Sequence, residues 1–124
     1  MKLYEVISLQ DFCNTVKNKN LPIKVAYKFT QLMLQVEKEI QFYSTELGKI
    51  IDQYAQKRDG ELVYTDDMTS IKIKAGFEEE CAQKILELRE FEVDLSAHSF
   101  SLNEISFLEI TPAQLTYMMP LIKN

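Results

Sequence analysis

The chain has 124 residues, of which 46% are hydrophobic and 27% charged, a balance that excludes extensive disorder and predicts one compact domain over residues 1–124. The net charge is −5, with the acidic excess in the C-terminal half. This argues against a nucleic-acid partner, because phosphate binding needs clustered basic side chains.

No apolar stretch matches the core of a signal peptide or the length of a membrane span. We therefore expect a protein that is made and stays in a cytoplasm, unless an assembly carries it elsewhere, and that has no membrane partner. Cys13 and Cys81 lack the spacing of a redox or metal motif and are expected to be small, reduced core residues.

The chain is expected to begin with a short strand over residues 2–7, where apolar and polar residues partly alternate. Ser8 and Asp11 have the spacing of a capped helix start, which predicts a helix from Leu9 to about Lys17. Because the polar link that follows is short, this helix should pack beside the next element.

A long amphipathic helix is predicted from about Leu21 to Arg58, opened by Asn20 and Pro22. Its apolar residues alternate spacings of three and four, the a/d pattern of a coiled coil. The series, called the seam below, is Ala26, Phe29, Met33, Val36, Ile40, Tyr43, Leu47, Ile50 and Tyr54. Gly48 is a candidate for a bend or a close helix contact, and we expect the helix to continue through it.

Gly60 is expected to end this helix, and strictly alternating residues predict a β-hairpin over 61–74, with strands at 61–65 and 70–74. A second helix is predicted from Phe77 to Glu90, running antiparallel to the second half of the long helix. Residues 21–90 would thus form an αα-hairpin with a β-hairpin at its tip.

The C-terminal segment 91–124 is expected to contain strands and short helices. Period-two alternation predicts strands at 91–95 and 106–110, which would join the N-terminal strand in a small sheet at the base. Capping signals predict helical turns at Ser101–Glu104 and Thr111–Met119. The expected fold class is α+β, mainly α.

The sequence contains no recognisable catalytic, cofactor-binding or metal-binding motif. His98, the one histidine, falls in a polar loop and is interpreted as a surface residue. The acidic residues after Phe77 could ligate a divalent cation, but their pattern favours a solvated helix face. Phe29, Tyr43 and Tyr54 lie on the seam, which favours packing over a ligand cage. We expect no enzyme activity, no cofactor and no small-molecule substrate.

Residues 20–122 resemble a group of small uncharacterised bacteriophage and prophage proteins. The resemblance is carried by the entry Leu21-Pro22-Ile23-Lys24, by Ala26-Tyr27-Lys28, by Glu37 and Glu39, by the run Ser-Leu-x-Glu at Ser101–Glu104, and by Thr-Pro-Ala-x-Leu at Thr111–Leu115. It implies a phage setting and no catalytic residues.

The hypothesis is therefore a non-enzymatic, phage-encoded protein-binding module, a small virion-associated or assembly protein that acts through self-association. The long helix would extend about 57 Å, more than its expected partner helices cover. The predicted interface of a homodimer or higher oligomer is the uncovered part of the seam, Phe29, Met33 and Val36, with Leu32 on its flank. The alternative is that residues 111–122 fold back over this strip and leave a monomer.

An alternative is an inhibitor of a host defence protein. In that hypothesis an acidic surface blocks a basic site on the host protein. The residues proposed for this surface are Glu78, Glu79, Glu80 and Glu87.

Overall fold

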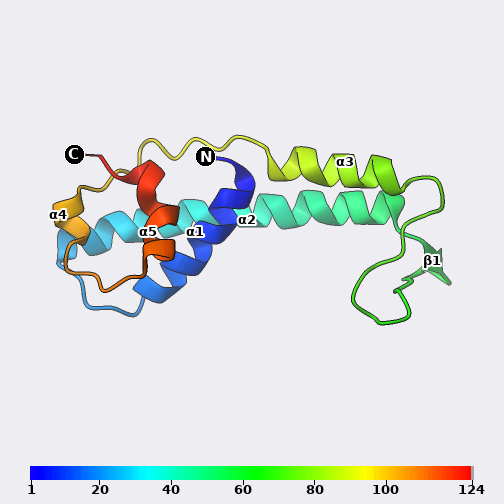
Figure 1. Cartoon of the computed structure of the whole chain (residues 1–124), viewed down its shortest axis with the longest axis horizontal. Helices are drawn as coiled ribbons and strands as arrows, with labels where there is room; N and C mark the ends of the chain where they lie inside the picture. The colour runs from blue at the N-terminus through cyan, green and yellow to red at the C-terminus, as the bar shows by residue number, and fades with distance from the viewer. Residues whose placement is uncertain (124) are drawn as a thin grey trace. The chain divides into compact units, whose positions relative to one another are not determined.

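The computed structural model describes residues 1–123 and is mainly helical, with one small two-stranded antiparallel sheet, as the expected α+β class requires (Figure 1). The elements are α1 Leu3–Val16, α2 Ile23–Tyr54, β1 Lys57–Arg58, β2 Glu61–Leu62, α3 Glu78–Arg89, α4 Leu102–Ile105, α5 Pro112–Met118 and the 3-10 turn η1 Met119–Leu121. Residue contacts divide the chain into two compact units. Unit 1 is Met1–Gln41 with the segment from Phe91 onward, and unit 2 is Phe42–Glu90.

The N-terminal residues form a helix, so the strand predicted over 2–7 is wrong. α1 begins at Leu3, well before the predicted start, and the Glu5 carboxylate accepts a hydrogen bond from the Lys2 backbone N–H at 2.9 Å. Leu3, Val6, Leu9, Phe12, Cys13 and Val16 are all buried. Their spacing, mainly of three residues, places them on one helix face, and this pattern outweighs a brief alternation of apolar and polar residues.

α2 is one continuous helix through Gly48, as predicted, although it ends at Tyr54 and not near Arg58. A Cβ placed on Gly48 would meet nothing within 4 Å, so this glycine marks no close contact within the chain. Gly60 does not cap the helix. With Asp59 it forms the two-residue turn between β1 and β2, where φ is 53° at Asp59 and 81° at Gly60, the conformation that an Asp-Gly hairpin favours.

Three phenylalanines from distant parts of the sequence form the centre of unit 1. The Phe29 ring lies 6.3 Å from that of Phe12 and 4.5 Å from that of Phe100, measured between centroids. All three side chains are at most 1% exposed. They join α1, the first half of α2 and the segment before α4 in one core.

This packing corrects the predicted self-association interface. Phe29, Leu32 and Val36 are at most 1% exposed, and Met33 is half-buried. Phe12 and Phe100 cover the strip at Phe29, and Cys13 of α1 lies beside Met33 and Val36. The spacing that predicted a dimer seam instead serves packing within one chain, so Phe29, Leu32 and Val36 are not available to a partner.

The small basal sheet is also absent from the described residues. The expected pairing of the N-terminus with 91–95 is reduced to one bridge between Lys2 and Glu92. In this bridge the Leu3 N–H donates to the Phe91 carbonyl, and the Val93 N–H donates to the Met1 carbonyl. Residues 106–110 form no strand.

The two C-terminal capping signals are confirmed. Ser101 caps α4 and Thr111 caps α5, and each has a reciprocal partner three residues later, Glu104 and Gln114. α5 packs on α1. A parallel bridge between Phe100 and Ile122 fixes the end of the chain beside the core.

In unit 2, α3 runs back along the second half of α2, as predicted for the αα-hairpin (Figure 1). The rings of Tyr54 and Phe77 lie 6.2 Å apart where the two helices meet, and Cys81 is buried there. Burial raises the pKa of Tyr54, and the neighbouring Glu80 carboxylate adds to the rise.

The predicted hairpin over 61–74 is only partly formed. Its two segments meet at a bridge between Tyr64 and Ile71, with the Lys72 N–H donating to the Val63 carbonyl at 2.8 Å. The regular strand pair lies earlier, between β1 and β2, because the Asp-Gly turn falls there.

Two leucines of α2 provide a matched test of this core. Leu32 is fully buried and Leu34 is 57% exposed. We expect Leu32→Ala to lower the free energy of unfolding by about 2–5 kcal/mol, and Leu34→Ala to change it by less than about 0.5 kcal/mol. Chemical denaturation of both variants measures this difference, and equal losses would contradict the burial described.

Candidate protein-binding surface on α2

The first half of α2 has a second apolar face. Ile23, Tyr27 and Leu34 are separated by four and seven residues and are 88%, 66% and 57% exposed. At 3.6 residues per turn they lie on the side of the helix opposite Phe29 and Leu32. We call these three residues the outer stripe.

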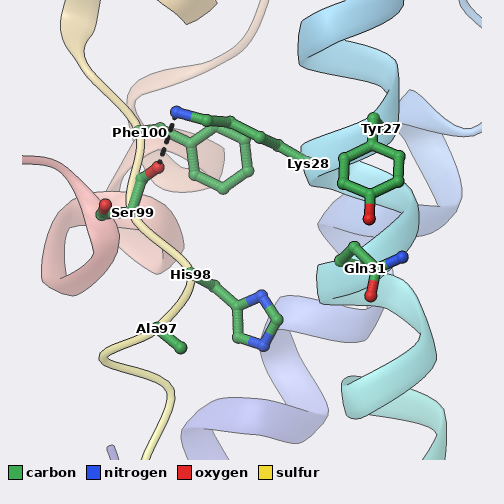
Figure 2. A pocket seen from close by; sticks show the side chains of 7 residues that line it. All are labelled: Tyr27, Lys28, Gln31, Ala97, His98, Ser99 and Phe100. Carbon is green, nitrogen blue, oxygen red and sulfur yellow. Dashed lines mark hydrogen bonds between the residues drawn. The ribbon is translucent and has the colours of Figure 1, made fainter.

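A groove lies next to the outer stripe, between α2 and the segment that leads into α4 (Figure 2). It has a volume of about 310 Å³, within the size range of ligand pockets. The residues that line it, called the α2 groove below, are Tyr27, Lys28, Gln31, Ala97, His98, Ser99 and Phe100. Tyr27 belongs to both the stripe and the groove.

Lys28 holds the two walls of the groove together. Its Nζ donates to the Ser99 carbonyl at 3.2 Å, lies 2.7 Å and 2.8 Å from the two carboxylate oxygens of Glu104, and is 5.7 Å from the centre of the Phe100 ring. Figure 2 shows the lysine reaching across the groove to Ser99. The hydrogen bond from Lys28 holds the pKa of Glu104 below its usual value, with a further contribution from the Ser101 backbone N–H.

His98 lies in the loop before α4, as predicted, but it is half-buried and is held by a residue of α2. Its Nε2 lies 2.5 Å from Gln35 Oε1, and the Gln35 amide nitrogen donates to the Asp94 carbonyl at 3.2 Å. Because the amide oxygen can only accept, His98 Nε2 is the donor. The imidazole thus ties the loop to the helix.

The groove is suited to binding a polypeptide. Lys28 is paired with Glu104 and His98 is hydrogen-bonded to Gln35, so these two lining residues hold the groove in shape. The aromatic ring of Tyr27 and the amide of Gln31 are exposed at the edge, next to the apolar outer stripe. Apolar contact beside a few polar groups is the pattern that receives an amphipathic helix.

The alternative acidic interface is exposed but is not one patch. Glu78, Glu79, Glu80 and Glu87 are all exposed. Successive residues of a helix point about 100° apart, so the first three face different directions. Glu79 and Glu87 lie away from the buried Cys81, whereas Glu80 is next to Tyr54.

Cys13 and Cys81 are free and buried, as expected. Among residues 1–123, no group of three or more His, Cys, Asp or Glu side chains is placed to hold a metal ion. In the same part of the chain, no helix combines the length and the hydrophobicity that crossing a bilayer requires.

Sequence reasoning missed the outer stripe, although its signal is present. The four- and seven-residue spacings of Ile23, Tyr27 and Leu34 are helical but lie outside the stronger a/d series. The contacts of the α2 groove join residues far apart in the chain, 76 positions for Lys28 and Glu104 and 63 for Gln35 and His98. No local pattern could have predicted them.

Comparison of the chain with models of protein families, with curated proteins and with solved structures gives no match.

The ion pair that joins the groove walls predicts a pH dependence. The pKa of Glu104 is lowered in the folded state, so its contribution to stability is present above the carboxyl pKa of the unfolded chain and is lost as pH falls through the folded value. Glu104→Gln removes the charge and keeps a residue suited to the capping box. We expect wild type to be more stable than Glu104→Gln at neutral pH, and the difference to shrink as pH falls below the ordinary glutamate pKa of about 4.3.

Thermal unfolding over a pH series measures this effect. Glu109→Gln is the control, because Glu109 is exposed in the same unit and its side chain makes no ion pair among the described residues. A difference between wild type and Glu104→Gln that is independent of pH would contradict a role for the charge.

Proposed function

We propose that this protein is a non-enzymatic, phage-encoded protein-binding module, a small virion-associated or assembly protein that acts through self-association. The observation that carries the proposal is the outer stripe, Ile23, Tyr27 and Leu34, which is exposed beside the α2 groove. A helix that is apolar on both faces is normally covered on both. The inner face of α2 is covered by its own chain, and a partner protein would cover the outer one.

The interactions of the polar groups support binding over catalysis. Lys28 is neutralised by Glu104, and the His98 imidazole is hydrogen-bonded to Gln35. Both pairs hold the groove in shape. A preformed surface of this kind lowers the entropy lost when a partner is ordered on it. The phage setting itself rests on the resemblance of residues 20–122 to small phage and prophage proteins.

The second candidate is an inhibitor of a host defence protein that blocks a basic site. It is favoured by the exposed carboxylates of Glu79 and Glu87 on one side of α3. Complementary charge increases the rate of association with a basic partner and makes it sensitive to salt.

Light scattering over a wide concentration series tests self-association. We expect the mass of the wild type to rise above that of one chain with concentration. Ile23→Ser with Tyr27→Ser should reduce this association, because the variant removes two apolar contacts of the outer stripe without changing a core residue. A wild type that stays monomeric throughout would overturn self-association.

Recovery of the tagged chain from infected cells separates the two candidates. Enrichment in purified virions or assembly intermediates supports the assembly protein. Enrichment with a host protein that is lost in Glu79→Lys, Glu87→Lys supports the inhibitor and contradicts the first proposal.

A further inference from the structure

The surface of α2 and that of α3 are complementary between copies of the chain. We propose that the acidic outer face of α3 in one copy docks on the outer stripe of α2 in another, so that the chains associate head to tail. This inference rests on the proposed self-association, and it names the two surfaces that would meet in the contact between copies.

The receiving surface on α2 combines the apolar outer stripe with a basic flank, and the exposed Glu37 lies on the other flank. Lys24 and Lys38 lie on one flank of the outer stripe at helical spacing. Both are exposed and make no ion pair with any of residues 1–123. Their charges, unlike that of Lys28, are therefore available to a partner.

The outer face of α3 has the opposite charge around an apolar centre. Leu86 is 47% exposed and lies on the side away from Cys81 and Leu88. Glu79 lies two turns before Leu86 on the same side, and Glu87 lies on the adjoining flank, about 100° around the helix. The face is an acidic amphipathic surface of the kind that binds in a hydrophobic groove with basic edges.

Like charge disfavours the binding of either surface to the same surface of a second copy. Two α2 stripes would bring lysines together, and two α3 faces would bring carboxylates together, and each arrangement is disfavoured by like charge. Docking α3 on α2 pairs the opposite charges and buries Leu86 against the exposed apolar residues. The contact is therefore heterologous, joining two different surfaces of identical chains.

A charge-reversal experiment tests this arrangement. Lys24→Glu, Lys38→Glu makes the α2 surface acidic, and Glu79→Lys, Glu87→Lys makes the α3 surface basic. Each double variant alone should lose self-association on the order of a hundredfold or more, because its own two surfaces now carry like charges.

The mixture of the two variants gives the decisive result. One intact α3 meets one intact α2 stripe, and the two reversed surfaces are complementary to each other. We expect a complex that contains both variants, weakened by added salt because the pairs are exposed. Light scattering of each sample and capture of one variant by a tag on the other measure it.

Controls with the same change in net charge separate specific from general effects. Lys72→Glu, Lys123→Glu and Glu61→Lys, Glu109→Lys alter exposed residues outside both surfaces and should retain wild-type association. Circular dichroism of every variant checks that the helices are retained.

Two outcomes would overturn the inference while the wild type still self-associates. In one, either reversed variant associates as well as wild type, which would place the interface elsewhere. In the other, both variants are monomeric and folded but the mixture forms no complex. A monomeric wild type would instead overturn the proposed self-association itself.

Discussion

The packing of Phe29 between Phe12 and Phe100 is the contact on which unit 1 depends. It joins three segments that are far apart in the sequence and buries the rings almost completely. By fixing Phe100 against α2 it also places the neighbouring residues along that helix, where the pairs Lys28–Glu104 and Gln35–His98 hold the α2 groove in shape. The hydrophobic core thus determines the shape of the candidate binding surface.

The same contact decides which face of α2 is free. When a helix has apolar residues on two sides, a side that the rest of the chain does not cover stays exposed to solvent. Because α1 and the C-terminal segment cover Phe29, Leu32 and Val36, the exposed face is the one that carries Ile23, Tyr27 and Leu34. Self-association therefore requires a surface different from the seam, and the lysines beside the outer stripe favour an acidic partner.

Local signals in the sequence were sufficient for several elements. The continuity of α2, the extent of α3 and the caps at Ser101 and Thr111 were predicted correctly, because helix periodicity and capping depend on residues within a few positions. The strand predicted over 2–7 failed because alternation in a short segment is ambiguous. The helical spacing of Leu3, Val6 and Leu9 was the stronger pattern there.

Long-range features could not be predicted in the same way. An a/d series predicts that a helix packs against another element. The same spacing suits a helix or segment of the same chain and a helix of a second chain. Phe29 was therefore assigned to an interface when it belongs to the core. The outer stripe was overlooked because it is the weaker of two apolar patterns on one helix. It stands out as an exposed surface only once the structure shows that the stronger pattern is covered by the same chain.

Cysteine cross-linking between copies shows directly whether α3 of one chain docks on the outer face of α2 in another. Burial raises the pKa of the Cys13 thiol to about 11 and also raises that of Cys81, so the native thiols react poorly. Tyr27→Cys and Leu86→Cys are made in separate chains and mixed under mild oxidation. We expect a disulfide that joins the two different variants. Its absence, or a predominance of disulfides between two copies of the same variant, would contradict docking of α3 on α2.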